Sequence, residues 1–207
     1  MATEKEIVDG VAKAVISQQD YLTELDSKIG DGDHGINMAR GFTAVLEAVE
    51  EMEDPSNLSE LLKTIGQTLI ETVGGAAGPL YGTAFIEASK ICGDHPPVTI
   101  ENVEKILAAG IEGIERRGHA QSGDKTMLDV LIPIHECFKP ENANGKTLRE
   151  CFNEASKAAR DGVEFTKTIP ANRGRASYLG EKSIGTEDPG AVSSMIMYRA
   201  FLAALRS

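Results

Sequence analysis

The chain has 207 residues, of which 41% are hydrophobic and 26% charged, a balance typical of one globular domain spanning residues 1–207. The net charge of −11 excludes nucleic acid and anionic membranes as main partners, because both repel an acidic surface. No apolar run approaches the roughly 20 residues that span a bilayer, and the opening MATEKEIVDG lacks a signal segment. Three cysteines without paired spacing predict reduced thiols in the cytoplasm.

Helical periodicity dominates the whole chain, and no segment alternates like a strand. Capping boxes at Thr3–Glu6 and Thr147–Glu150 open two helices, and Asp188-Pro189 is typical of a third helix start. Eight helices are predicted, with approximate bounds 3–29, 38–52, 58–73, 79–91, 99–118, 125–138, 147–169 and 188–202.

Short connections favour antiparallel neighbours, so we predict an all-α, up-and-down array of about eight helices closed into a barrel. Four connections are richer than ordinary turns: 26–35, 74–82, 117–127 and 171–190. They are the first, third, fifth and seventh, and alternate connections of such an array fall at the same end. We therefore expect a site at that end.

The first of these connections reads DSKIGDGDHG, and its glycines match the G-x-G-x-x-G fingerprint of dinucleotide-binding loops. That mechanism needs a strand before the glycines, whereas the preceding residues are helical. An EF-hand starting at Asp31 needs Glu at its twelfth position, where Phe42 stands. Both motifs are rejected.

What remains is a cluster of three carboxylates, Asp26, Asp31 and Asp33. Asp31 and Asp33 point to the same side if the chain is extended, and three converging carboxylates call for a cation. Oxygen ligands alone select a hard ion such as Mg²⁺. The alternative is that these residues only cap helices and form turns.

Two further connections carry weaker signals. Gly-rich GGAAGPLYG at 74–82 allows close backbone approach to a ligand, although a simple helix–helix turn explains it nearly as well. Residues 171–190 hold Arg173, Arg175 and Lys182 in an otherwise acidic chain. This long connection is either an arm that brings positive charge to phosphates or a flexible surface loop.

Four segments together resemble one known family. LTELDSKIGDGDHGINMARGF, VGGAAGPLYGTAF, RGHAQSGDKTMLDVLIP and GRASYLGEKSIGTEDPGAVSSM occur in this order and cover the chain from about Tyr21 to its end. They resemble the nucleotide-binding subunit of dihydroxyacetone kinase, the DhaL type. The resemblance implies an eight-helix barrel with the nucleotide at one end.

The resemblance also implies roles for individual residues. Asp26, Asp31 and Asp33 match carboxylates that hold two Mg²⁺ ions bridging the phosphates of ADP or ATP, and Arg175 would offset phosphate charge. Ala77 often is Ser in relatives, so a hydroxyl contact to phosphate is absent here. The implied nucleotide contacts are His34, Gly35, Ile36, Asn37, Ala76, Ala77, Gly118, Met127, Arg175, Asp188, Pro189 and Gly190.

The family contains two kinds of enzyme. One uses ATP directly, commonly with a fused dihydroxyacetone-binding domain. The other is split, and its nucleotide subunit keeps ADP as a coenzyme that a phosphohistidine protein of the phosphotransferase system rephosphorylates. This chain leaves no room for a substrate domain, so we expect the split kind, with phosphoryl transfer to dihydroxyacetone on a partner subunit. The alternatives are an ATP-dependent kinase subunit for a small polyol or ketose and a nucleotide-sensing regulator of a transcription factor.

Overall fold

The computed structural model describes residues 2–206. These residues form ten α-helices and one 3₁₀-helix and contain no strand, which confirms the all-α prediction. No helix among them is both long and apolar enough to cross a lipid bilayer. In chain order the elements are α1 (Glu4–Ser17), α2 (Gln19–Ile29), α3 (His34–Glu50), α4 (Leu58–Thr72), α5 (Ala77–Cys92), α6 (Ile100–Gly118), α7 (Leu128–Glu136), α8 (Pro140–Ala143), α9 (Leu148–Thr166), η1 (Arg175–Ser183) and α10 (Pro189–Ala204).

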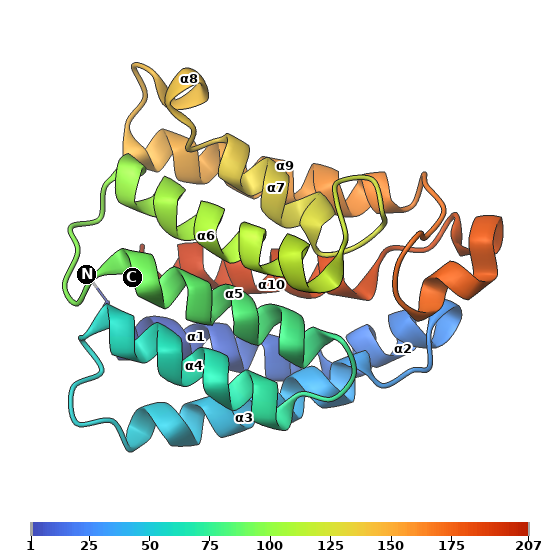
Figure 1. The fold of residues 1–207 in the computed structure, drawn as a ribbon, viewed down its shortest axis with the longest axis horizontal. Coiled ribbons are helices and arrows are strands. Elements are labelled where there is room, and N and C mark those ends of the chain that lie inside the picture. The colour runs from blue at the N-terminus through green and yellow to red at the C-terminus, as the bar shows by residue number, and fades with distance from the viewer. Residues whose placement is uncertain (1, 207) are drawn as a thin grey trace.

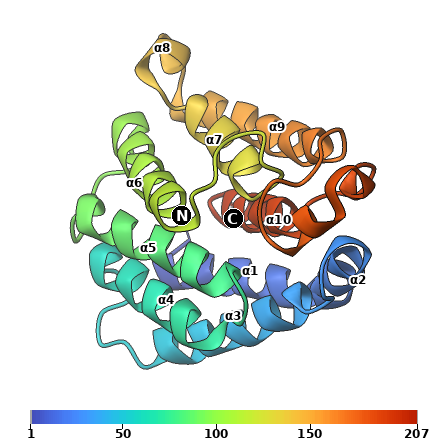
Figure 2. The same ribbon diagram turned by 45° about the vertical axis from the view of Figure 1, so that its right-hand side comes forward.

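The long helices contact one another in a cyclic order (Figure 1, Figure 2). Helices α3, α4, α5 and α6 pack side by side in chain order, and α7, α9 and α10 continue the series. Helix α10 then packs on α1, which in turn packs on α3. The series thus returns to its start, as expected for up-and-down helices arranged in a ring.

The apolar positions that the helical spacing selected are the ones that fill the interior. On α3, Met38, Phe42, Val45 and Val49 are at most 3% exposed. Because steps of three and four residues return to one face of a helix, this series forms a stripe that packs against the neighbouring helices. The core therefore holds the helix starts and ends in fixed positions.

Figure 1 shows that the connections of the ring fall into two groups. The predicted segments 26–35, 74–82, 117–127 and 171–190 lie together at the right-hand end of the view, which we call the loop end. The connections 51–57, 93–99 and 137–147 lie at the opposite end, which we call the cap end. The expected grouping of alternate connections is present.

The first predicted helix, 3–29, is two helices rather than one. Gln18 leaves the helical conformation with φ −101° and ψ 12°, and the Ser17 hydroxyl donates to the carbonyl of Ala14 at 2.8 Å. The break lets α2 press on the start of α3, where a β-carbon on Gly35 would lie 2.0 Å from the Gln19 carbonyl oxygen. Tertiary packing therefore overrides a continuous helical pattern.

Three other features differ from the prediction, besides shifts of a few residues at the start of α3 and the end of α9. Helix α7 begins at Leu128 rather than near Lys125, because Lys125 has a left-handed φ of 59°. A short helix, α8, interrupts the connection to α9. Residues 171–190 are more ordered than an irregular connection: they contain the 3₁₀-helix η1, which is kinked at Gly180.

Candidate metal and nucleotide site

The turn between α2 and α3 is held by the carboxylate of Asp26. This side chain lies in the last turn of α2 and is 9% exposed. Its Oδ2 accepts hydrogen bonds from the backbone N–H groups of Asp33 (2.9 Å) and His34 (3.2 Å). A negative charge at the start of a helix is favourable, because the free N–H groups and the helix dipole are positive there. Asp26 is therefore a capping residue, as one of the two interpretations of the sequence expected.

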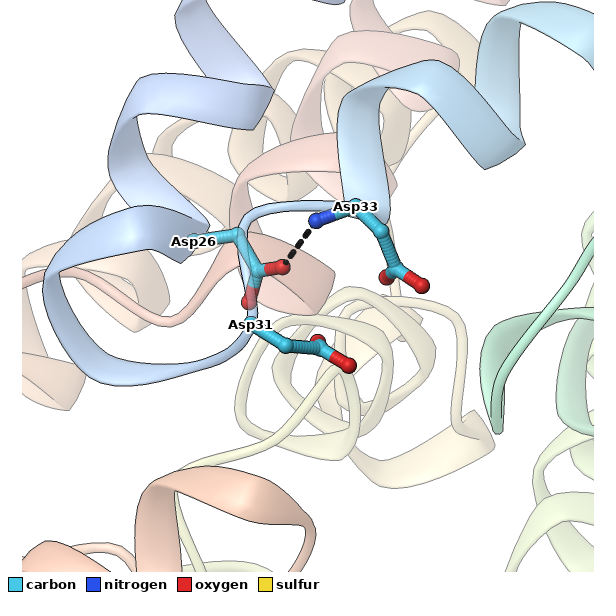
Figure 3. Close-up of side chains that lie close together, drawn as sticks. All are labelled: Asp26, Asp31 and Asp33. Carbon is cyan, nitrogen blue, oxygen red and sulfur yellow. Dashed lines mark hydrogen bonds between the residues drawn. The ribbon is translucent and has the colours of Figure 1, made fainter.

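Capping uses only one oxygen atom of Asp26. Its Oδ1 has no hydrogen-bond partner among residues 2–206, and Asp31 and Asp33 place their carboxylates beside it (Figure 3). One ligand oxygen from each of the three lies within 4.8 Å of the other two. The predicted convergence is present, and the capping and metal interpretations are compatible.

The reason for this convergence differs from the expected one. The segment is not extended: Gly32 has φ +72°, and Asp33 has helical angles of φ −115° and ψ −9°. The chain therefore reverses at Gly32 and carries Asp33 back towards Asp26. A β-carbon at position 32 would lie 2.6 Å from the Ser27 hydroxyl, so the turn requires glycine on two grounds.

The donor set fits a hard divalent cation. The three residues offer carboxylate oxygens only, and Asp31 and Asp33 are open to solvent. Oxygen ligands from a few carboxylates, with room for water or phosphate oxygens, suit Mg²⁺. Gly30 also keeps this space free, because a β-carbon there would lie 2.1 Å from Asp26 Oδ1.

Two helices at the loop end begin with unpaired backbone N–H groups. In α3, the amides of Gly35 and Ile36 have no hydrogen-bond partner in the described part of the chain. In α5, the same holds for Ala77 and Gly78, and the N-cap residue Ala76 offers no side-chain cap. Such helix starts favour anions, because several N–H groups and the helix dipole face the same space.

Glycine and asparagine residues bring these two starts close together. A β-carbon at Gly74, just before α5, would lie 2.9 Å from Oδ1 of Asn37 in α3. The Asn37 side chain is itself fixed, because Arg40 donates to the same oxygen at 2.7 Å and to the Thr72 carbonyl at 2.8 Å. The Gly-rich run at 74–82 is therefore more than a turn: it lets α5 start beside α3.

The arm 171–190 places Arg175 on the acidic cluster. The Arg175 Nε lies 2.6 Å from Asp31 Oδ2, although its side chain is 69% exposed. The base of the arm is anchored by Ala171 N–H, which donates to the Ser183 hydroxyl at 2.8 Å, and by Gly185 N–H, which donates to the Lys167 carbonyl at 2.8 Å. These contacts disfavour the flexible-loop interpretation.

The other predicted residues lie at helix ends around the same space. Gly118 ends α6 against Leu80 of α5, and Met127 is the N-cap residue of α7. A β-carbon on Gly190 would lie 3.5 Å from the Met127 backbone nitrogen. Asp188 caps α10 through the Ala191 N–H at 2.7 Å, and Pro189 is the first residue of that helix.

Burial shifts the pKa values of two residues here. It raises the pKa of the Asp188 carboxyl to about 7, an effect that the Ala191 N–H and the Lys125 ammonium oppose. Burial also lowers the pKa of the His34 imidazole, although the carboxylates of Asp26 and Asp33 act in the other direction.

Sequence reasoning missed several buried polar residues that support this site. Lys125 is 1% exposed, and its ammonium donates to the carbonyls of Thr166 and, at 2.6 Å, Thr186. It thereby ties the end of α9 to the segment that leads into α10. Its neighbour Asp129, also 1% exposed, accepts from the N–H groups of Gly123 (2.5 Å) and Thr126 (2.8 Å). The available signal for their burial was the presence of charged residues in and beside a glycine-containing loop.

A model of the DAK2 domain matches residues 28–203. The chain belongs to the DAK2 domain family. This DAK2 domain is 44% identical over 188 residues to the "PEP-dependent dihydroxyacetone kinase 1, ADP-binding subunit DhaL" of Listeria innocua, covering 91% of this chain and 88% of the relative. It is 40% identical to the corresponding ADP-binding subunit of Escherichia coli, covering 92% and 90%.

Solved structures agree with this assignment. The crystal structure of the dihydroxyacetone kinase of C. freundii superposes on this DAK2 domain with a TM-score of 0.74 at 26% identity, covering 99% of this chain and 34% of that one. The same kinase in complex with AMP-PNP and Mg²⁺ gives a TM-score of 0.71 at 26% identity, covering 98% and 33%. The present chain thus spans about a third of those crystallised chains.

Proposed function

We propose that this chain is the ADP-binding subunit of a split dihydroxyacetone kinase, with residues 1–207 acting as one nucleotide-binding domain. It would transfer a phosphoryl group from a magnesium-bound nucleotide to dihydroxyacetone held by a partner subunit. The observation that carries the proposal is the acidic cluster beside two helix starts with unpaired amides. The DhaL relatives, matched over almost their whole length, supply the substrate class.

The cation would be held by Asp26 Oδ1 and the carboxylates of Asp31 and Asp33. Two Mg²⁺ ions are proposed, since three close carboxylates bear enough charge for more than one ion. When bound, Mg²⁺ neutralises negative charge on the phosphates. Asp26 would keep its second oxygen on the start of α3, so the metal ligand stays rigidly oriented.

The nucleotide phosphates would lie against the amides at the starts of α3 and α5. The Ala77 side chain provides no hydroxyl, so its backbone N–H would make the contact. Arg175 lies on the arm within reach of the cluster and would offset the charge of the transferred group. Met127 and the residues Asp188–Gly190 line the neighbouring helix starts and would contact the rest of the nucleotide.

The donor distinguishes two versions of this enzyme. We propose that ADP stays bound as a coenzyme and that a phosphohistidine protein of the phosphoenolpyruvate-dependent phosphotransferase system rephosphorylates it. The relatives named as PEP-dependent support this version. The free thiols of Cys92, Cys137 and Cys151 fit a cytoplasmic enzyme.

Turnover with defined donors tests the proposal. The purified chain is mixed with its dihydroxyacetone-binding subunit, and product is measured with ATP alone or with phosphoenolpyruvate, the phosphotransferase proteins and ADP equimolar to the chain. We expect many turnovers only in the second mixture. Sustained turnover with ATP alone would show an ATP-dependent kinase, and absence of transfer in both, despite tight Mg–ADP binding, would favour a nucleotide-sensing regulator.

A further inference from the structure

A buried chain of hydroxyl groups connects the start of α3 to α5 and α10. The His34 Nε2 lies 3.0 Å from Ser193 Oγ, which lies 2.8 Å from the Tyr81 hydroxyl. The Tyr81 oxygen also lies 2.8 Å from the Gly190 carbonyl oxygen and 2.8 Å from Ser194 Oγ. Tyr81, Ser193 and Ser194 are at most 3% exposed, so these groups must satisfy one another.

The number of protons in this network limits the direction of each hydrogen bond. A hydroxyl group carries one proton, and a carbonyl oxygen can only accept. The contact between Tyr81 and the Gly190 carbonyl therefore uses the Tyr81 proton. Ser194 must then donate to the Tyr81 oxygen, because two oxygen atoms at 2.8 Å with no proton between them repel. For the same reason Ser193 donates to the Tyr81 oxygen at 2.8 Å in preference to the Gly190 carbonyl at 3.1 Å.

This assignment determines what His34 does. The Ser193 proton is directed at Tyr81 or at the Gly190 carbonyl oxygen, which lies 3.1 Å from Ser193 Oγ, so in both cases Ser193 can only accept from the imidazole. The reverse arrangement, in which Ser193 donates to Nε2, leaves a 2.8 Å contact of Tyr81 with either Ser193 or Gly190 without a proton. We propose that Tyr81 and Ser193 are positioning residues that fix a proton on Nε2 of His34 and hold its ring against α10.

The arrangement fixes the first turn of α3 from two sides. The His34 backbone N–H is bound to Asp26 at 3.2 Å, and its ring is bound to Ser193 on α10. The unpaired amides of Gly35 and Ile36 follow directly in the chain. The consequence for ADP rests on the proposed function: a displaced first turn would bind the phosphates less tightly.

The proton on Nε2 is measured directly in the ligand-free wild-type chain. Long-range ¹H–¹⁵N correlation spectra of ¹⁵N-histidine-labelled protein at pH 8 distinguish the two neutral tautomers. The chain has four histidines, and the His34 signal is assigned by its loss in a His34→Gln variant. We expect Nε2 to carry a proton. An unprotonated Nε2 would overturn the inference without any bearing on nucleotide binding.

Two serine variants form a matched pair for the positioning role. Ser193→Ala removes the acceptor of the His34 proton, whereas Ser194→Ala removes a partner of Tyr81 that does not touch His34. In Ser193→Ala we expect a mixture of tautomers and about a tenfold weaker Mg–ADP affinity, which corresponds to about 1.4 kcal/mol. In Ser194→Ala the tautomer and the affinity should stay as in the wild type.

The variants also separate this inference from the proposed function. Equal loss of affinity in both serine variants, or an unchanged His34 tautomer in Ser193→Ala, would reject the positioning role. Tyr81→Phe leaves the Ser193 proton with the 3.1 Å contact to the Gly190 carbonyl as its acceptor, so it should shift the tautomer less than Ser193→Ala does. A protonated Nε2 in a wild-type chain that binds no Mg–ADP would support the proton assignment while rejecting the nucleotide function.

Discussion

The two ends of the helical ring start their helices in different ways. At the cap end, α1, α4, α6 and α9 each begin with a side-chain cap, from Thr3, Asn57, Thr99 and Thr147. At the loop end, the N-cap residues of α3, α5 and α7 provide no such cap. The start of α5 has no side-chain cap at all and so forgoes about 1 kcal/mol of stability. Asp26 caps α3 from outside that helix and Thr126 binds the first N–H of α7, so the N–H groups left free for a ligand are those of α3 and α5.

Helix α10 departs from this contrast, because it starts at the loop end and is capped by Asp188. Since burial raises the pKa of this carboxyl from 3.8 to about 7, the folded state binds a proton that the unfolded state releases between those values. The contribution of the Asp188 carboxyl to the free energy of unfolding is therefore present below about pH 4 and is lost as the pH rises through about 7.

Asp188→Asn should remove this pH-dependent loss of stability while keeping the cap on α10. In metal-free buffer, the free energy of unfolding of the variant relative to the wild type should increase by up to about 4 kcal/mol from pH 4 to pH 8. Urea denaturation at several pH values measures this difference. A constant difference across that range would contradict the raised pKa.

The acidic cluster is the strongest test of the loop end as a ligand site. Asp31→Asn should weaken Mg–ADP binding about 100-fold, or about 2.7 kcal/mol, because a charged ligand of the cation is lost. Isothermal titration calorimetry measures the affinity. The control is Glu24→Gln, which removes a carboxylate on α2 that pairs with Lys28 at 3.0 Å but lies outside the cluster. Equal affinities for all three proteins would show that the cluster is only structural.

A pair of glycines tests whether the tight turn serves the cluster. Gly30→Ala places a β-carbon 2.1 Å from Asp26 Oδ1 and should cost about 2 kcal/mol of stability, as well as weakening Mg²⁺ binding. Gly10 lies within α1, and the β-carbon of a Gly10→Ala variant would lie 3.7 Å from the Ala204 side chain of α10, an ordinary contact. This variant should stabilise the chain by about 0.5–1 kcal/mol. Thermal unfolding with and without Mg²⁺ compares the two, and similar effects would refute the steric argument.

The smallest expected effect belongs to the cap end. Thr147→Ala removes the capping box of α9 and should cost about 1 kcal/mol of stability. Mg–ADP affinity should be unchanged, because this cap lies at the end opposite the acidic cluster. Calorimetry and thermal unfolding on the same preparation measure both quantities. A loss of Mg–ADP affinity would contradict the assignment of ligand binding to the loop end alone.

Much of this architecture could be predicted from local patterns. Apolar spacing placed the helices, and the capping boxes at Thr3 and Thr147 marked two starts correctly. The parity of the connections grouped the four rich segments, and the three aspartates of one loop suggested a cation site. These signals depend on residues close together in the chain, so they can be read from a single sequence.

The remaining features depend on contacts between distant segments. The break at Gln18 follows from the packing of α2 on α3, and the Tyr81–Ser193 contact joins residues 112 positions apart. The burial of Lys125 could not be predicted, because a lysine in a loop normally reaches solvent. The partners of such residues are determined only once the ring has closed.

The shared use of Asp26 links two equilibria. One oxygen holds the amide protons of Asp33 and His34, and the other faces the proposed cation. Any ion that binds this carboxylate only in its capping position also lowers the population of the state in which those two hydrogen bonds are open, by thermodynamic linkage. The exchange of these two amide protons with solvent would thus report cation occupancy directly, with no added label.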